Sequence, residues 1–323
     1  MNKTYLKEII RLRVEETDYD SLHIAFGVDN NYLRFACVTM LSIIKHTKKK
    51  VCFHIFCDHI DADDIRKLKK IVECKDDIDI ICYLVDDSSF KDFPQGNGWN
   101  LSIYYRAIAP YVLEEKVDKV LYLDADILCL RDVSELFAVD IDDVVAAVVK
   151  DGISEGRVDK RLELLGMDKD AIYFTAGVML INVYEYNRLN TLSKFVDVIN
   201  EKKEELFFFD QDALNLLLCK NVIFVDDIFN FQVFDKTNKQ PCLVHFAGVR
   251  KPWFRNFDYY YFDDWRSVFF ELDWGRELAC KKSIKPSEYR YQSEYHFNKG
   301  NYLQAIKDYG IYLLAKMKKL FFN

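Results

Sequence analysis

The 323-residue sequence contains no uninterrupted run of about 20 apolar residues, and its first 20 residues are charged. A membrane-spanning helix needs ~20 apolar residues, and a secretory signal needs an apolar core. We therefore expect a cytoplasmic protein. The nine cysteines form no pair of CxxC motifs, and several lie in apolar runs such as 51–57. We expect them to be reduced core residues.

The chain also has no excess of positive charge. It contains 45 Lys and Arg and 52 Asp and Glu, a formal net charge of -7, which argues against a general nucleic-acid binder. The charge is uneven. From Lys281 onward, nine Lys or Arg and three Asp or Glu give +6, which leaves -13 on the preceding 280 residues. Hydrophobic residues make up 50% of the chain, enough to bury a large core.

Apolar runs of strand length alternate with helical patterns in the first half, which predicts an α/β fold with a mostly parallel, Rossmann-like sheet flanked by helices. Parallel sheets bind ligands at the carboxyl ends of their strands. The predicted strands are 22–26, 51–57, 78–84, 119–123 and 144–149, and the predicted helices are 32–46, 61–74 and 102–114. Later features are an apolar run at 172–183, a helix from about 210, and short strands at 222–225 and 242–246.

We expect three parts in the chain: an N-terminal extension at 1–20, one domain at 21–275, and a basic amphipathic segment at 276–323. In the last part, apolar residues at helical spacing are flanked by lysines. This helix could pack on the main domain. We favour contact with an anionic membrane surface, into which Leu313, Met317, Leu320 and Phe321 would insert.

Two carboxylates, Asp124 and Asp126, follow the predicted strand 119–123 and are separated by Ala125. Their oxygens suit Mg²⁺ or Mn²⁺, and such a cation can bridge phosphates and offset the charge of a leaving nucleoside diphosphate. The spacing alone is more often structural. An aspartyl-nucleophile phosphatase also begins with a DxD motif, but it requires Gly-Thr where this chain has Ile127-Leu128.

Other polar residues occupy places that a nucleotide sugar would use. His245 ends a predicted strand and offers a nitrogen ligand for Mn²⁺, Gly248 permits close approach of a phosphate, and Lys251 places a cation on it. A lone histidine there is usually structural, but this combination favours a functional role. Asp210 and Gln211 open a helix, where they either cap it or face the sugar, and we interpret Asp212 as structural.

Together these residues resemble glycosyltransferase family 8, above all the lipopolysaccharide core galactosyl- and glucosyltransferases of Gram-negative bacteria. The resemblance covers about residues 22–275. Its motifs, in order, are FGVDNNY at 26–32, YR at 105–106, LYLDAD at 121–126, YFTAGV at 173–178, DQD at 210–212, and HFAG at 245–248 with KPW at 251–253.

The resemblance implies a GT-A fold, a UDP-glucose or UDP-galactose donor, Mn²⁺ or Mg²⁺, and transfer with retention to a lipopolysaccharide core. The metal would be held by Asp124, Asp126 and His245, with Ala125 between the two acids. Asp210 and Gln211 would be the catalytic residues. The remaining donor contacts carry over by position: Gly27, Asp29 and Asn31 for uridine, Arg106 for phosphate or sugar, Thr175, Ala176, Asp210 and Gln211 for the sugar, and Gly248 and Lys251 for the diphosphate.

One departure concerns the sugar: many relatives have Asn at the position of Thr175. Glucose and galactose are therefore both kept as donors. An acceptor growing on the cytoplasmic face of the inner membrane fits a peripheral enzyme with a basic C-terminal segment. Two alternatives are a family 8 transferase with a soluble acceptor and a catalytically silent sugar-nucleotide-binding protein. The basic segment argues against the first, and the complete set of Asp124, Asp126, His245 and Lys251 against the second.

Overall fold

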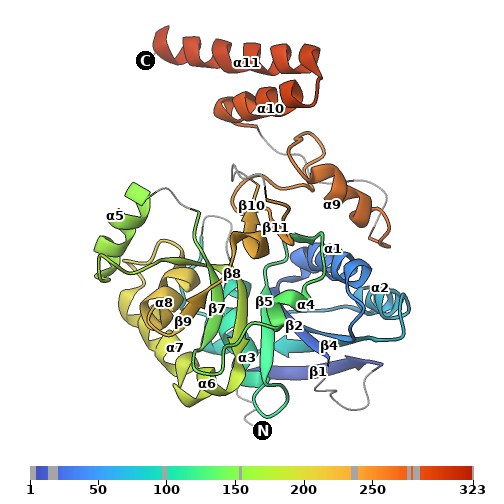
Figure 1. Ribbon diagram of the computed structural model, residues 1–323, viewed down its shortest axis with the longest axis vertical. Coiled ribbons are helices and arrows are strands. Elements are labelled where there is room, and N and C mark those ends of the chain that lie inside the picture. The colour runs from blue at the N-terminus through green and yellow to red at the C-terminus, as the bar shows by residue number, and fades with distance from the viewer. Residues whose placement is uncertain are drawn as a thin grey trace. The chain divides into compact units, whose positions relative to one another are not determined.

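The computed structural model describes residues 5–13, 21–96, 100–152, 155–233, 239–274, 278 and 284–321. The chain forms two compact units, Met1–His245 and Phe246–Asn323. The first unit contains an eight-stranded sheet of order β1-β4-β3-β2-β5-β8-β7-β9 and a three-stranded sheet of order β10-β11-β6 (Figure 1).

The strands of the first unit are β1 (Leu6–Leu12), β2 (Leu22–Val28), β3 (Val51–Cys57), β4 (Ile78–Val85), β5 (Lys119–Leu123), β6 (Ile127–Cys129), β7 (Ala146–Lys150), β8 (Phe174–Asn182), β9 (Val222–Phe224), β10 (Phe231–Gln232) and β11 (Leu243–His245). Its α-helices are α1 (Asn30–His46), α2 (Ala62–Val72), α3 (Tyr105–Val112), α4 (Ser134–Phe137), α5 (Glu155–Leu165), α6 (Val183–Arg188), α7 (Thr191–Lys202) and α8 (Phe209–Leu218). Its 3-10 helices are η1 (Asp87–Ser89), η2 (Leu101–Tyr104) and η3 (Asp227–Asn230).

The predicted α/β class is confirmed, and the parallel part of the sheet comprises β4, β3, β2 and β5. The other neighbours are mixed. Strand β8 runs antiparallel to β5 and β7, and β9 is parallel to β7. Strand β1 lies within the range expected to be an N-terminal extension, and it pairs antiparallel with β4. Because β2, β3 and β5 run in parallel, Asp29, Asp58 and Asp124 follow strand ends at the same edge of the sheet.

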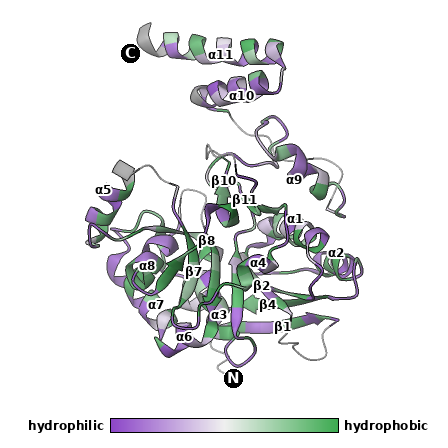
Figure 2. Ribbon diagram, viewed as in Figure 1, coloured by the Kyte–Doolittle hydropathy of each residue, from purple (hydrophilic) through white to green (hydrophobic). Residues whose placement is uncertain are grey.

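The core of the first unit surrounds the central strands. All seven residues of β3 and all nine of β8 are buried, which explains why both strands are composed mostly of apolar residues. In Figure 2, β8 is coloured mainly as hydrophobic. Six of the eight described cysteines are buried and all eight are free thiols, so the expectation of reduced core residues holds for most of them. Cys74 is exposed and Cys219 is half-buried.

Two buried hydroxyl groups on helix α1 bind the three-stranded sheet, called the small sheet below, through β6. Thr39 Oγ1 donates to the carbonyl of Ile127 at 2.7 Å, and Ser42 Oγ accepts from the backbone N–H of Cys129 at 3.0 Å. These bonds satisfy the backbone of β6 on the side away from its partner β11. Helix α1 therefore fixes the strand that follows Asp126.

The second unit contains α9 (Phe262–Phe269), α10 (Pro286–Asn298) and α11 (Tyr302–Phe321). Its aromatic segment 254–274 contributes core residues, with Phe257, Phe262 and Trp265 each 0% exposed. Arg266 orders this segment, because its guanidinium donates to the carbonyls of Pro252, Phe254 and Phe257. Helices α10 and α11 pack on each other. No helix within the described ranges is both long enough and apolar enough to span a bilayer.

Candidate metal and nucleotide-sugar site

Three predicted ligands, Asp124, Asp126 and His245, come together at the end of β5. One ligand atom from each lies within 4.8 Å of the others. The Nε2 atom of His245 is 3.2 Å from Asp126 Oδ1 and 3.7 Å from Asp124 Oδ2. Asp126 and His245 are buried, whereas the Asp124 side chain is 25% exposed, so the cluster opens to solvent on the Asp124 side. Two carboxylates and one imidazole are a suitable donor set for Mn²⁺, and less so for Mg²⁺.

Strand pairing explains how residues 119 positions apart in sequence meet. Strand β11 is antiparallel to β6, and the register places His245 opposite Ile127, the residue after Asp126. The backbone N–H of Asp124 donates to the carbonyl of Gly177 in β8 at 2.9 Å. The acids are thus held between β8 and the small sheet, and the histidine is brought to them by its strand.

A buried amide orients the imidazole. His245 Nδ1 is 2.8 Å from Oδ1 of Asn230, and Asn230 is 2% exposed at the end of η3. The amide oxygen can only accept, so Nδ1 is the donor in this contact, and a cation held between Nε2 and the acids would bind the Nε2 lone pair. This second contact is the kind that orients histidine ligands in metal sites. Sequence reasoning missed Asn230, since nothing in its local pattern distinguishes it.

Because Gly177 has no side chain, it leaves room for His245 and Asp124. A Cβ added there would lie 2.4 Å from His245 Cε1 and 2.8 Å from Asp124 Oδ2. Any side chain at this position would therefore displace a predicted ligand. Gly177 belongs to the motif at 173–178, but no role had been predicted for it.

Arg106 joins the acids to Asp210. Its Nη2 donates to Asp124 Oδ1 at 2.8 Å, and its Nε lies 2.7 Å from Asp210 Oδ2. The guanidinium also stacks on Tyr122, at 4.9 Å from the ring centroid. Arg106 and Asp210 are 8% and 6% exposed, so their attraction is little screened by water. Both residues therefore lie beside the predicted metal ligands, and the predicted contacts of Arg106 with phosphate or sugar and of Asp210 with the sugar stay predictions.

Burial and neighbouring charges shift the pKa values of both Arg106 and Asp210 upward, but for different reasons. Burial lowers the pKa of Arg106, but Asp124 and Asp210 raise it by more, and the net shift is upward, so the guanidinium stays charged. Burial raises the pKa of Asp210 to about 6. The positive charge of Arg106 opposes this shift, and the negative charge of Asp124 adds to it. Asp210 therefore titrates close to neutral pH.

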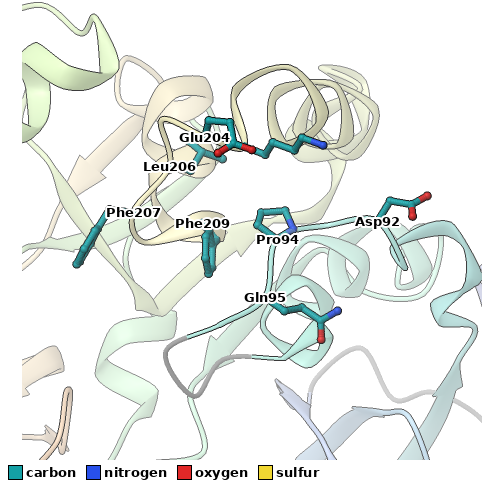
Figure 3. A pocket seen from close by; sticks show the side chains of 8 residues that line it. Asp92, Pro94, Gln95, Glu204, Leu206, Phe207 and Phe209 are labelled. Carbon is teal, nitrogen blue, oxygen red and sulfur yellow. The ribbon is translucent and has the colours of Figure 1, made fainter.

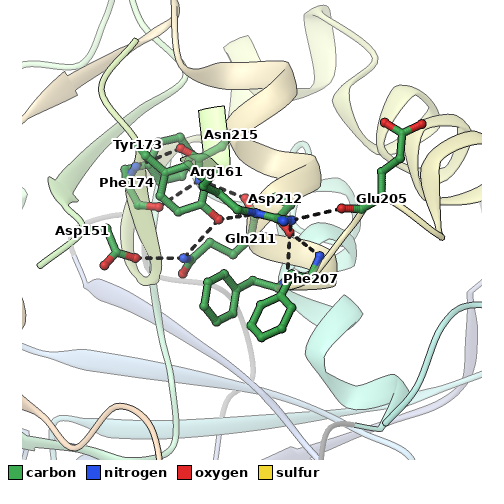
Figure 4. A network of polar contacts seen from close by, with 10 residues as sticks. Asp151, Arg161, Tyr173, Phe174, Glu205, Phe207, Gln211, Asp212 and Asn215 are labelled. Atoms are coloured by element: carbon green, nitrogen blue, oxygen red, sulfur yellow. Dashed lines mark hydrogen bonds and ion pairs between the residues drawn. The ribbon is translucent and has the colours of Figure 1, made fainter. Parts of the chain in front are cut away.

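Gln211 is held at both ends of its amide, and Figure 4 shows its contacts with Asp151 and Tyr173. Its Oε1 accepts from the backbone N–H of Ala176 at 3.0 Å, and its Nε2 donates to Asp151 Oδ2 at 2.9 Å and to the Tyr173 hydroxyl at 3.3 Å. The Ala176 N–H can only donate, which fixes the amide orientation. Asp151, buried just after β7, thus positions Gln211, and sequence reasoning missed it.

Asp212 is structural, as predicted. It is 0% exposed, and its carboxylate accepts from Arg161, from the Tyr173 hydroxyl at 2.6 Å, and from the backbone N–H groups of Phe207 and Phe208 (Figure 4). Helix α8 begins without a side-chain cap from its N-cap residue, so Asp212 ties the preceding turn to the helix. The same network holds α5 through Arg161.

The residues predicted for uridine lie around the start of α1. Asp29 is its N-cap: one oxygen accepts from the backbone N–H of Tyr32 at 2.8 Å and the other from Asn100 Nδ2 at 2.6 Å. Asn31 is exposed in the first turn. Gly27 has a packing role, because a Cβ there would be 2.9 Å from Tyr105 Cβ. A contact of these residues with uridine stays a prediction.

The remaining predicted residues divide between the units. In β8, Thr175 and Ala176 are buried, and Ala125 is 7% exposed between the two acids. Gly248 and Lys251 belong to the second unit. Gly248 has a φ of +77°, which favours glycine, and Lys251 Nζ donates to the carbonyl of Phe246 at 2.9 Å. Their contact with a diphosphate stays a prediction.

A pocket of about 520 Å³ lies beside the start of α8 (Figure 3). Phe209, the residue before Asp210, is part of its wall, and the 56% exposed ring of Phe207 is another part. Apolar rings together with carboxylate, amide and ammonium groups are the surfaces that sugars contact. The lining residues are Asp92, Pro94, Gln95, Lys203, Glu204, Leu206, Phe207 and Phe209.

The fold is similar to that of a solved glycosyltransferase. A crystal structure of the galactosyltransferase LgtC in complex with donor and acceptor sugar analogues covers 83% of this chain and 99% of its own, with a TM-score of 0.67 and 23% identity. An active-site mutant of LgtC gives a TM-score of 0.69 over 84% of this chain. The predicted GT-A fold is therefore confirmed.

The family follows from the sequence match. Residues 23–256 match the description of glycosyl transferase family 8, and the chain belongs to that family. It is similar to a lipopolysaccharide 1,2-glucosyltransferase of Escherichia coli, with 28% identity over 94% of both chains. A lipopolysaccharide 1,3-galactosyltransferase of Salmonella typhimurium is 28% identical over the same share of each chain. The lipopolysaccharide glucosyltransferase WaaO of Escherichia coli K12 is 30% identical over 94% of this chain and 93% of its own.

Proposed function

We propose that this protein is a retaining, metal-dependent hexosyltransferase that moves glucose or galactose from a UDP-sugar to the core oligosaccharide of lipopolysaccharide. The observation that carries the proposal is the cluster of Asp124, Asp126 and His245 beside Arg106 and Asp210. Full-length similarity to both a glucosyltransferase and a galactosyltransferase supports the acceptor class and leaves both sugars as donors.

The protein's own residues would bind and orient the donor. Asp124, Asp126 and His245 would hold Mn²⁺ or Mg²⁺, which when bound offsets the negative charge of the diphosphate. Arg106 is permanently charged and rigidly held by stacking and ion pairs, so it provides a fixed positive charge at the donor site. Asp210, beside Arg106, would accept hydrogen bonds from sugar hydroxyls in its ionised form.

The hydrogen bonds of Gln211 favour a front-face mechanism, in which the acceptor attacks from the side of the leaving group and the anomeric configuration is retained. An amide oxygen is a weak nucleophile, and this one already accepts a hydrogen bond from Ala176, so attack on the anomeric carbon would break the network. In the proposed step the bond from C1 to the phosphate oxygen breaks first. The acceptor hydroxyl then attacks C1 from the same face, and the departing phosphate oxygen takes the hydroxyl proton. Trapping of a glycosyl adduct on Asp210 or Gln211 would contradict this route.

The basic C-terminal hairpin would bring the enzyme to its acceptor at the cytoplasmic face of the inner membrane. Helix α11 exposes large apolar side chains, with Leu303, Ile306 and Leu314 at 85%, 70% and 62%. Lys307, Lys316 and Lys318 on the same helix are exposed too. An exposed apolar surface flanked by lysines fits the interface of an anionic bilayer, where apolar groups insert and lysines meet lipid phosphates.

The function is tested by measuring UDP release from UDP-glucose and UDP-galactose, with truncated core lipopolysaccharides as acceptors and with Mn²⁺ present or chelated. We expect release that needs both metal and acceptor, and a product heavier by one hexose. Asp126→Ala should abolish metal-dependent transfer, because two of three ligands cannot hold the ion productively. The matched control is Asp143→Ala, an exposed acid that should leave turnover unchanged. Unchanged turnover in Asp126→Ala would remove the central claim.

A further inference from the structure

Two groups of potential metal ligands come together within the described residues, and only one belongs to the site above. The second consists of His23 on β2 and Cys52 and His54 on β3, with one ligand atom of each within 4.8 Å of the others. Their exposures are 3%, 3% and 1%. We propose that His23, Cys52 and His54 form a second metal centre for one thiophilic d¹⁰ cation, Cu⁺ or Zn²⁺.

Strand register explains the convergence. In the parallel pair of β2 and β3, His23 lies opposite Cys52, so their side chains leave the sheet on the same face. His54 is two residues after Cys52 and returns to that face. His23 Nδ1 and His54 Nε2 are 3.0 Å apart, slightly less than the separation of two nitrogens that share a metal at ~2.0–2.1 Å in tetrahedral geometry.

The surroundings hold His54 in the orientation of a ligand. Its Nδ1 is 3.1 Å from the hydroxyl of buried Tyr83 on β4. When Nδ1 donates its proton to Tyr83, Nε2 carries no proton, and a cation that replaces its hydrogen bond with His23 Nδ1 can bind its lone pair. Outer contacts of this kind, from the second nitrogen of a histidine to an oxygen, are a regular feature of metal centres.

Ligand type and charge determine which cation fits. One thiolate and two neutral imidazoles favour soft or borderline metals over Mg²⁺ or Ca²⁺. Three ligands can complete a trigonal Cu⁺ centre, and Cu⁺ with one thiolate is neutral overall, which suits a buried position. Zn²⁺ would leave one positive charge and would take a fourth ligand. Either ion displaces one proton from the Cys52 thiol on binding.

The second centre is separate from the catalytic one. His23 and Cys52 stand at the starts of β2 and β3, whereas Asp29 follows the end of β2. Five residues of strand from His23 to Val28 correspond to ~16 Å. The ion would therefore cross-link two central strands rather than contact a substrate. Loss of this centre should lower stability and leave metal-dependent UDP release intact under folding conditions.

The two centres can be distinguished spectroscopically, because only the second contains a thiolate. Co²⁺ replaces Zn²⁺ and gives a near-ultraviolet thiolate-to-cobalt band when a cysteine is a ligand. Full-length protein is loaded with Co²⁺ both by titration after chelator treatment and by growth in Co²⁺-supplemented medium, because the site is buried. In parallel, Cu⁺ is titrated against a chromophoric Cu⁺ chelator. We expect one thiolate-dependent equivalent in one or both arms, and a higher melting temperature in the loaded protein.

Matched variants locate the ion. Cys52→Ser should lose the thiolate band or the Cu⁺ equivalent, and so should His54→Gln, whereas Cys82→Ser, which removes another buried thiol, should keep it. Asp126→Ala should keep it as well, which separates this result from failure of the proposed function. Absence of a thiolate-dependent equivalent from the wild-type protein in both arms would overturn the proposal even if variants fail to fold. Retention of the equivalent by folded Cys52→Ser would overturn it too.

Discussion

At the scale of single residues, the predicted chemistry depends on side chains that are held in place by contacts with their neighbours. His245 is oriented by Asn230, Gln211 by Ala176 and Asp151, and Arg106 by two carboxylates and the Tyr122 ring. Such preorganisation is the main means by which a site stabilises developing charge. Small changes beside these residues should therefore have large effects.

Gly177 provides the most local example. In Gly177→Ala the new Cβ would meet His245 Cε1 at 2.4 Å and Asp124 Oδ2 at 2.8 Å, so one ligand must move. We expect metal affinity to fall by about 10-fold or more, measured by Mn²⁺ titration of UDP release. Gly310→Ala is the control, since a Cβ there has nothing within 4 Å. Normal affinity in Gly177→Ala would show that the cluster tolerates displacement.

The raised pKa of Asp210 predicts that the free energy of unfolding depends on pH. Burial raises its pKa from 3.8 to about 6, so in metal-free protein the folded state retains this proton to higher pH than the unfolded state. The stability from this proton is fully present below about pH 4 and is lost as pH rises through about 6. Asp210→Asn lacks the ionisable group. Its free energy of unfolding relative to wild type should rise by up to ~3 kcal/mol between pH 4 and 7. Urea unfolding with chelator present measures this, and parallel curves would contradict it.

At the scale of elements, the site is assembled by contacts between helices and strands. Helix α1 holds β6 through Thr39 and Ser42, β6 pairs with β11, and β11 carries His245. Helices α5 and α8 and strand β8 are joined around Asp212 (Figure 4). The predicted metal ligands and the predicted sugar contacts therefore come from elements far apart in sequence.

The Asp212 network predicts an unequal cost for two arginine substitutions. Arg161→Met leaves the fully buried Asp212 carboxylate without its cation, so we expect a loss of about 3 kcal/mol in the free energy of unfolding. Arg188→Gln breaks a pair with Glu185 on one helix, in which Arg188 is exposed to solvent, and should cost much less than Arg161→Met. Urea denaturation of both variants provides the comparison. Equal losses would show that the buried pair has no special weight.

At the scale of the whole molecule, charge is distributed by region. The chain carries a formal -7 overall, while the segment from Lys281 onward is basic, with nine Lys or Arg against three Asp or Glu. An acidic protein with one basic, partly apolar helical hairpin would meet an anionic surface through that hairpin. Localisation would then follow from a region outside the nucleotide-sugar site.

Charge reversal tests this arrangement. Lys307→Glu, Lys316→Glu and Lys318→Glu together should weaken binding to phosphatidylglycerol-containing vesicles by about 100-fold, given ~1 kcal/mol per lysine at the surface. Vesicle flotation at two salt concentrations measures the change, and UDP release with a soluble acceptor should be unaffected. The control reverses exposed Lys69 and Lys70 on α2. Equal binding by the triple variant and wild type would remove the membrane role.

The sequence by itself determined the class of fold and the position of the acids. The apolar runs at 22–26, 51–57, 78–84 and 119–123 predicted β2, β3, β4 and β5, because a strand buried on both faces must be apolar throughout. Asp124 and Asp126 were predicted to be metal ligands because they follow such a strand and accompany other motifs in a fixed order. Those signals are local, and sequence carries local information directly.

Only the tertiary structure decided what surrounds those residues. Asn230, Asp151 and Gly177 became visible as partners through strand register and helix packing, and their local patterns do not distinguish them from ordinary turn or strand residues. The same holds for His23, Cys52 and His54, which lie in apolar runs and meet only when β2 and β3 pair. The physical reason is that contacts across strands depend on register, and register is a property of the assembled sheet.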